Sequence, residues 1–263
     1  MNGKQLKNSI LQWAIQGKLV PQDPNDEPAS VLLERIRAEK ARLVKEKKIK
    51  KDKNESIIYR GEDNSYYEKF LATREVKCID EEIPFEIPAT WEWCRLLSIV
   101  SLLGDGIHGT PEYSEGGSVY FINGNNLFDG QILIKPDTKT VSKEEAVKHS
   151  RLLNESTVLV SINGTIGNIA FYSGENVILG KSACYFNLLN GIERKYIKIV
   201  LQTDYFLEYT KRVATGSTIK NVPLSGMRNV LIPIPPKDEQ QVIIDKLSSL
   251  KLLIEKFNIE QSQ

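Results

Sequence analysis

Four short loops rich in Asn, Thr, Ser and Gly carry the side chains best suited to recognising another molecule. An asparagine amide can make two hydrogen bonds to an adenine edge, and Ser and Thr hydroxyls can bond to bases or phosphates. Glycine lets a backbone approach a phosphate closely. Ordinary turns use the same residue types, so each loop taken alone is explained equally well by local structure. The candidate recognition residues are His108, Thr110, Asn123, Asn125, Asn126, Asn163, Thr165, Ser217, Thr218 and Asn221.

Basic side chains are unevenly distributed along a chain whose formal net charge is only +1. Residues 194–228 contain seven Lys or Arg and two Asp or Glu, whereas residues 60–86 contain four basic and eight acidic side chains. A basic face on a near-neutral protein is what binding to a polyanion requires, although a solvated surface gives the same count. The cations that we expect to contact mainly nucleic-acid phosphates are Lys211, Arg212, Lys220 and Arg228.

Motifs for catalysis are incomplete in this sequence. The segment 174–182 resembles a phosphate-binding P-loop, but five residues rather than four separate Gly174 from Gly180, and a strand is predicted to follow instead of a helix. Neither a methyltransferase cofactor loop with its Asn-Pro-Pro-aromatic tetrapeptide nor a nuclease Pro-Asp with an acid-x-Lys triplet is present. His108 and His149 are the only histidines. The sequence therefore predicts a binding protein without a catalytic residue, with an enzyme built on unrecognised carboxylates as an alternative.

Cysteine and hydropathy patterns restrict the class of protein further. Cys78, Cys94 and Cys184 are isolated, so they predict neither a disulfide framework nor a zinc site, and we expect them to be small buried side chains. No metal and no cofactor are predicted for the chain itself. It has no run of about 18 apolar residues and no apolar signal segment, which predicts a cytoplasmic protein without a membrane partner.

Short apolar runs separated by glycine and asparagine turns dominate residues 83–236. Strands that follow one another without intervening helices favour an α+β fold whose mostly antiparallel sheet curls on itself. We expect residues 83–236 to form the binding domain, with one helix at 196–213. The predicted strands are Val119–Ile122, Gln131–Ile134, Thr157–Ile162, Ile166–Tyr172 and Ala183–Leu189.

Helical segments are predicted on both sides of this domain. Apolar residues at helical spacing indicate two helices within residues 1–52, the second opening at Pro28. Residues 53–82 are polar, acidic and weakly periodic, which indicates a linker or a loosely packed arm. Residues 237–263 form a further helix, with acidic side chains in its first turn, where the helix dipole favours them.

The last helix carries the most regular apolar pattern of the sequence. Its apolar residues are spaced 4, 3, 4 and 3 positions apart, as in a coiled-coil seam. A seam needs a partner helix, although docking of the helix on its own domain explains the pattern equally well. The seam residues are Ile243, Leu247, Leu250, Ile254 and Phe257.

Taken together and in order, these segments resemble the specificity subunit of type I restriction-modification enzymes. The resemblance covers nearly the whole chain, and no single motif is decisive. One departure is clear: the usual subunit has two recognition domains and two long helices, whereas this chain has one domain, as in a half-subunit or a truncated chain. The segments that carry the resemblance are Ile15–Glu34, Gly109–Pro111, Val158–Gly167, Thr215–Thr218 and Ile232–Gln240.

This resemblance implies a DNA-recognition subunit that reads one half of a bipartite target in double-stranded DNA. It implies a partner methyltransferase subunit that modifies adenine with S-adenosylmethionine, and a restriction motor-nuclease subunit in the full complex. It also implies self-association through the helices, so that two identical recognition domains read an interrupted palindrome. The alternative from another class is a coiled-coil adaptor that holds proteins together without binding DNA.

Overall fold

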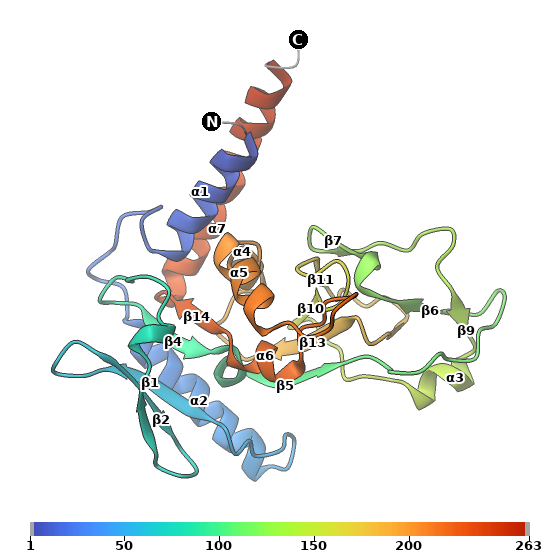
Figure 1. Ribbon diagram of the computed structural model, residues 1–263, viewed down its shortest axis with the longest axis horizontal. Helices are drawn as coiled ribbons and strands as arrows, with labels where there is room; N and C mark the ends of the chain where they lie inside the picture. The colour runs from blue at the N-terminus through green and yellow to red at the C-terminus, as the bar shows by residue number, and fades with distance from the viewer. Residues whose placement is uncertain (1–2, 261–263) are drawn as a thin grey trace. The chain divides into compact units, whose positions relative to one another are not determined.

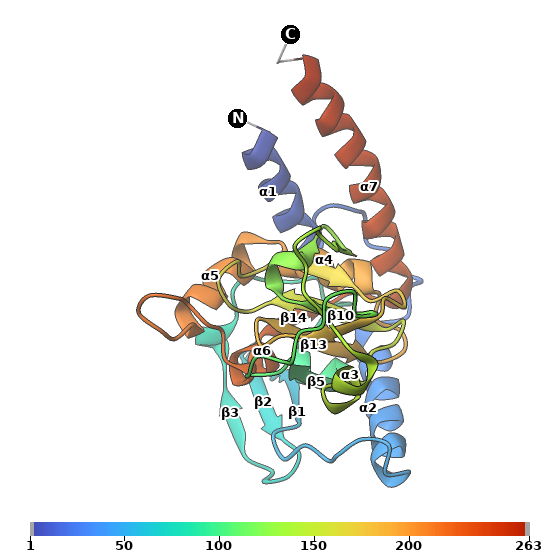
Figure 2. The same ribbon diagram turned by 90° about the vertical axis from the view of Figure 1, so that its right-hand side faces the viewer.

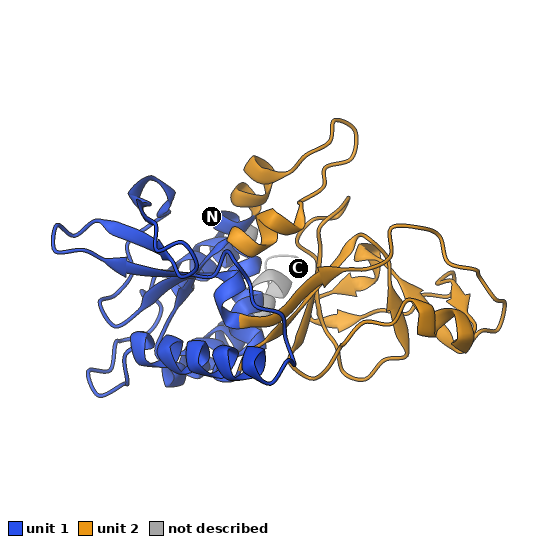
Figure 3. Ribbon diagram, turned by 90° about the horizontal axis from the view of Figure 1, so that it is seen from below, with its two compact units in different colours: residues 1–99, 190–206, 230–263 blue, residues 100–189, 207–229 orange. Residues whose placement is uncertain are grey.

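The computed structural model describes the backbone of residues 3–260 and their side chains, except at position 4 and at 252–260. The described chain divides into two compact units (Figure 3). Unit 1 comprises residues 1–99, 190–206 and 230–263, and unit 2 comprises residues 100–189 and 207–229. The chain therefore enters unit 2 twice and returns to unit 1 each time.

Unit 1 combines helices with two small antiparallel sheets. One sheet has the strand order β1-β2-β3, and the other pairs β14 with β4. Helix α5 (Asp204–Val213) begins in this unit and ends in unit 2. The other elements are α1 (Gly3–Ile15), α2 (Ala29–Lys45), β1 (Ser56–Arg60), β2 (Tyr66–Phe70), β3 (Val76–Cys78), the 3-10 turn η1 (Asp80–Glu82), β4 (Glu92–Arg95), η2 (Leu96–Ile99), α4 (Arg194–Leu201), β14 (Leu231–Ile234) and α7 (Lys237–Glu260).

Residues 53–82 form the sheet β1-β2-β3 instead of the linker or loose arm that their polar composition indicates. Ile58 and Tyr66 pack with the fully buried Trp93 of β4 in one apolar cluster. The Arg95 guanidinium neutralises the buried carboxylate of Glu68 through two hydrogen bonds, from Nε at 3.1 Å and from Nη2 at 2.6 Å. The acidic composition of this segment indicates a solvated arm, because the sequence alone does not show that the buried Glu68 is paired with Arg95 on another strand.

The predicted boundaries of the binding domain also differ from those of unit 2. Residues 83–99, 190–206 and 230–236, which the sequence analysis assigns to the binding domain, belong to unit 1. The reason is strand pairing, because β14 and β4 hydrogen-bond to each other across a long separation in sequence. The predicted helix at 196–213 is two helices, since the Thr203 hydroxyl accepts a hydrogen bond from the Phe206 N–H and caps α5.

The helices of unit 1 confirm the sequence reading of the first fifty residues. Helix α1 ends before Gly17, whose φ of 67° is the left-handed value that glycine adopts at helix ends. Ala14 and Ile15 are fully buried, while Trp13 is about half exposed. Helix α1 lies beside α7, as Figures 1 and 2 both show.

Unit 2 is built from short strands with few helices. Its largest sheet has the order β11-β10-β13-β5, and all of its pairings are antiparallel. Parallel pairing occurs between β12 and β6. The elements are β5 (Val100–Asp105), β6 (Val119–Ile122), the 3-10 turn η3 (Gly124–Asn126), β7 (Leu127–Phe128), β8 (Gln131–Ile132), β9 (Thr140–Val141), α3 (Lys143–Lys148), β10 (Thr157–Ser161), β11 (Ile169–Phe171), β12 (Val177–Leu179), β13 (Ala183–Leu188) and α6 (Leu224–Asn229).

The two central strands of unit 2 hold its core. Every residue of β10 and β13 is buried, and Leu159 and Tyr185 join the apolar cluster that includes Ile122. Strands buried on both faces read as continuous apolar runs, which is why the sequence marks them clearly. The α+β fold with mostly antiparallel sheets is thus confirmed.

Candidate nucleic-acid interface

The loop after β6 is a rigid turn whose asparagines have different surroundings. Asn123 and Asn126 form a capping box around η3. The Asn126 amide donates to the Leu133 carbonyl at 2.9 Å and to the Thr138 hydroxyl at 3.3 Å, and its oxygen accepts from the Asn123 N–H at 3.0 Å. Asn126 is 5% exposed, so its hydrogen-bonding capacity is used inside unit 2. Asn125 is exposed beside it.

A second segment, 180–182, fastens this turn to the sheet. The Ser182 hydroxyl donates to Asn123 Oδ1 and accepts from the Gly124 N–H, both at 2.9 Å. A Cβ atom at Gly180 would lie 2.2 Å from Asn123 Oδ1, so only glycine fits there. Gly180 and Ser182 belong to the segment 174–182, which resembles a P-loop. In the fold they allow this close packing of two loops.

The loop that follows β5 joins the same group. Ile107 is buried, and its N–H donates to the Leu179 carbonyl at 2.8 Å, directly before Gly180. His108 is exposed and its Nε2 lies 2.8 Å from Asp105 Oδ2. Thr110 is also exposed. This loop therefore presents a histidine and a hydroxyl while its backbone is held by the sheet.

The loops 161–167 and 215–221 lie against each other. The Val222 N–H donates to the Ile162 carbonyl at 2.8 Å, and Asn163 and Asn221 form an isolated antiparallel bridge. Asn163 Nδ2 donates to Asn221 Oδ1 at 3.3 Å. The first of these loops also reaches the turn after β6, since Asn168 Nδ2 lies 3.5 Å from the Gly124 carbonyl.

All four predicted recognition loops are therefore connected within unit 2, although they are far apart in the sequence. Their polar side chains differ in availability. Asn123, Asn163 and Asn221 are half-buried and hydrogen-bonded within the unit. The exposed ones are His108, Thr110, Asn125, Thr165, Ser217 and Thr218.

The predicted phosphate-binding cations are in three kinds of surroundings. Lys211 is exposed and pairs with Glu208 at 2.6 Å, and Arg212 lies over the Tyr209 ring, 6.0 Å from its centroid. Lys220 is exposed on the 215–221 loop. Arg228, on α6, is half-buried.

Sequence reasoning missed two further lysines at this group of loops. Lys181 is exposed between Gly180 and Ser182. Lys135 is exposed, and its Nζ donates to the Asn125 carbonyl at 2.8 Å. The sequence does not reveal the location of Lys181, because the segment around it resembles a nucleotide-binding motif. Only the tertiary fold brings Lys135 next to Asn125.

The three cysteines differ in burial. Burial raises the pKa of the Cys94 and Cys184 thiols, which makes them poor nucleophiles. Cys78 is exposed, contrary to the expectation that all three cysteines are buried. Within the part of the chain that the structure describes, no three His, Cys, Asp or Glu side chains are placed to hold a metal ion.

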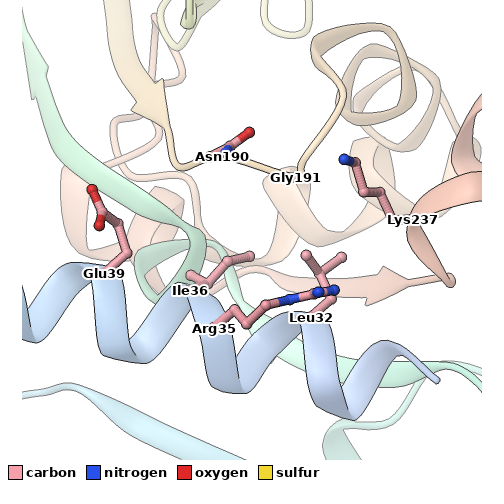
Figure 4. Close-up of a pocket in the computed structure, with 7 residues that line it drawn as sticks. All are labelled: Leu32, Arg35, Ile36, Glu39, Asn190, Gly191 and Lys237. Atoms are coloured by element: carbon pink, nitrogen blue, oxygen red, sulfur yellow. The ribbon is translucent and has the colours of Figure 1, made fainter. Parts of the chain in front are cut away.

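A hollow of about 370 Å³ lies elsewhere, in unit 1 (Figure 4). It is bordered by Leu32 and Ile36 of α2, by the turn at 190–191 and by Lys237 at the start of α7. Arg35 at its rim is paired with Glu27. None of the predicted recognition residues lines this hollow.

The predicted seam on α7 is partly buried in unit 1. Ile243 is fully buried, whereas Leu247 and Leu250 are half-buried. The side chains of Ile254 and Phe257 lie outside the described residues. The helix thus starts as ordinary core, and it packs beside α1 and α4. Among the helices of residues 3–260, none has the length and apolar character needed to cross a membrane.

Comparison of the sequence with protein-family models gives a match over residues 88–262 to a type I restriction modification DNA specificity domain. The chain is 32% identical over 252 residues to the specificity subunit of the type I restriction enzyme EcoAI from Escherichia coli, covering 93% of this chain. It is also 32% identical over 260 residues to the EcoEI specificity subunit from the same species, covering 95% of this chain. In both cases the match spans 39% of the relative's length.

Solved structures resemble the fold as well. A chain from work on complex assembly and conformational transition of the type I restriction-modification system superposes with a TM-score of 0.52 at 20% identity, covering 68% of this chain and 43% of that one. The HsdS subunit from Thermoanaerobacter tengcongensis gives a TM-score of 0.50 at 18% identity, over 68% of this chain and 41% of its own. At these identities the likeness concerns the fold alone.

Proposed function

We propose that this chain, which belongs to the type I restriction modification DNA specificity family, recognises a specific sequence in double-stranded DNA through the four connected loops of unit 2. The observation that carries the proposal is the hydrogen-bonded convergence of these loops. A rigid set of donors and acceptors is what reading base edges requires, because mobile side chains lose entropy on binding.

Base readout is assigned to the exposed amide and hydroxyl groups of these loops. Asn125 offers a complete amide, which matches an adenine edge. The Asn163–Asn221 pair uses one donor and one acceptor internally and presents its other amide atoms as a unit. Asn126 is omitted from the proposed contacts, since its amide is fully used within the fold.

Phosphate contacts are assigned to the exposed lysines around the loops, which are Lys135, Lys181 and Lys220. They are also assigned to Lys211, Arg212 and Arg228, which are close in sequence to the 215–221 loop. Contacts of this kind fix the register of a protein on DNA without reading its sequence. Each contact also releases counterions, so binding weakens as salt rises.

The chain acts without a catalytic residue of its own and positions a partner. That partner is an adenine methyltransferase subunit, which carries S-adenosylmethionine as methyl donor, and a restriction motor-nuclease subunit completes the complex. Two copies of the chain associate through α7 together with α1, and two identical recognition units then read the two halves of an interrupted palindrome.

Selection of bound sequences from random duplex DNA, with the full chain and its cognate methyltransferase, tests this function. We expect one enriched sequence with two related halves, and a logarithm of affinity that falls linearly with the logarithm of salt concentration. Binding of duplex DNA without an enriched sequence would contradict sequence-specific recognition. The absence of any salt-dependent shift of duplex DNA would favour the coiled-coil adaptor instead.

A further inference from the structure

A large apolar side chain stands at the tip of an otherwise polar loop in unit 2. Ile219 is 61% exposed, and its neighbours Thr218 and Lys220 are exposed as well. In the four connected loops the other large apolar residues point inward: Ile107 and Ile162 are buried, and Ile166 is half-buried. Ile219 is therefore the apolar group that this surface presents to solvent within residues 106–110, 123–126, 161–167 and 215–221.

The backbone of the loop fixes Ile219 in this position. Thr215 and Asn221 exchange two backbone hydrogen bonds, at 2.8 and 2.9 Å, which close the loop at its base. Gly216 has a φ of 93°, and a Cβ atom there would lie 2.4 Å from the Ile219 carbonyl oxygen. The tight turn needs glycine and leaves little freedom for the residue opposite it.

Packing within unit 2 does not explain the isoleucine. Val222, the next apolar residue along the chain, is fully buried and anchors the end of the loop, whereas Ile219 keeps most of its surface in water. A polar residue would suit an exposed turn better, because turn positions favour Gly, Asn, Asp and Ser. An apolar side chain that is flanked in sequence by a hydroxyl and an ammonium group is suited to bind an apolar group within a polar ligand.

We propose that Ile219 is a specificity-determining residue that contacts the C5-methyl group of a thymine in the DNA target. The inference rests on the proposed function. Thymine presents its methyl group in the major groove directly beside a hydrogen-bond acceptor, so an apolar side chain flanked by Thr218 and Lys220 matches that edge. Cytosine lacks the methyl group at the same position and presents a donor, and an apolar contact distinguishes the two pyrimidines.

Deoxyuridine provides the test, because it pairs with adenine as thymine does and lacks only the methyl group. Each thymine of the selected target is replaced in turn by deoxyuridine, and affinity is measured with the full chain plus cognate methyltransferase. One replacement should weaken wild-type binding about fourfold, the equivalent of one buried methyl group. Ile219→Ala should weaken binding to the thymine duplex by a similar factor. Combining both changes should also cost about fourfold, since both remove the same contact.

Matched variants separate this contact from general effects. Ile219→Val keeps a branched apolar side chain and should retain most of the thymine preference. Leu152→Ala removes a side chain that is 76% exposed outside the four loops and should change no deoxyuridine effect. A combined loss near sixteenfold would overturn the contact, and so would an Ile219→Ala protein that keeps every deoxyuridine effect. In either case sequence-specific binding, and with it the proposed function, would stand. Failure to select any sequence removes the proposed function itself.

Discussion

Replacing Lys181 and Lys220 together by Ala should lower the salt dependence of DNA binding without changing the preferred sequence. Both side chains are exposed. Lys220 lies on the 215–221 loop, and Lys181 lies in the 180–182 segment, which the Ser182 hydroxyl bonds to the Asn123 turn. Each lysine that neutralises one phosphate contributes about 0.9 to the slope of log affinity against log salt. The double variant should therefore lose about 1.8 from that slope.

The slope translates into a difference that a titration resolves easily. Raising salt from 50 to 200 mM is a fourfold change, so one contact weakens binding about 3.5-fold over that range and two contacts about 12-fold. The wild-type chain should lose about 12-fold more affinity than the double variant over this range. Fluorescence anisotropy with a labelled duplex at several salt concentrations, with cognate methyltransferase present, gives both slopes.

A control of equal charge decides whether position matters. Lys50 and Lys51 are exposed in the segment between α2 and β1 of unit 1. These two lysines belong to none of the four connected loops. Replacing this pair by Ala changes the net charge equally and should leave the slope nearly unaltered. Equal slopes for the two double variants, or an altered sequence preference in the first, would refute the assignment of Lys181 and Lys220 to phosphates.

Three further outcomes are expected. Asn126→Ala should lower stability by about 1–3 kcal/mol, because it leaves buried partners unpaired; Asn125→Ala should relax base preference and leave the melting temperature unaltered, and the reverse result would contradict their assignments. Changing Leu247 and Leu250 to Asp should abolish self-association in analytical ultracentrifugation while unit 2 remains folded; a persistent dimer would exclude α7 as the pairing helix. Burial raises the pKa of Glu239 above its ordinary 4.5, outweighing hydrogen bonds from Trp91 and Gln22, so protonation of this acid is easier in the native state than in the unfolded chain. The native state therefore loses stability as pH rises through the raised pKa. The melting temperature of Glu239→Gln minus that of the wild type should be larger at pH 7 than at pH 5, and a constant difference would contradict this.

The parts of the fold that were predictable are those governed by local pattern. Strand β6 has the bounds read from the sequence, and the fully buried β10 and β13 appear as apolar runs between turns. Turn residues marked the four connected loops for the same reason, since glycine and asparagine adopt conformations that other residues avoid. The sheet at 56–78 was missed because its stability depends on Trp93 and Arg95, which are distant in sequence.

The local sequence pattern does not predict which of the candidate side chains are exposed. Asn125 and Asn126 are adjacent and chemically identical, yet one is exposed and the other is saturated by Leu133 and Thr138. Nothing in their own spacing distinguishes them, because the partners come from a separate segment. The same holds for Lys181, whose location beside the Asn123 turn follows from the Ser182 hydroxyl that links the two loops.

In the connected loops, most atoms that hold the fold together differ from the atoms that we assign to the ligand. The bonds that hold the loops together are mostly backbone hydrogen bonds or involve half-buried side chains such as Ser182 and Asn163. The exposed side chains assigned to the ligand, including Asn125 and Ile219, stand outside these bonds. The Asn163–Asn221 pair is the exception, since it links two loops and is also assigned to the ligand. Substitutions at exposed loop positions away from such bonds usually cost less than about 0.5 kcal/mol. A scaffold of this kind can therefore change its target sequence by exchange of exposed residues while its anchoring residues stay fixed, which is the property that a DNA-recognition subunit needs.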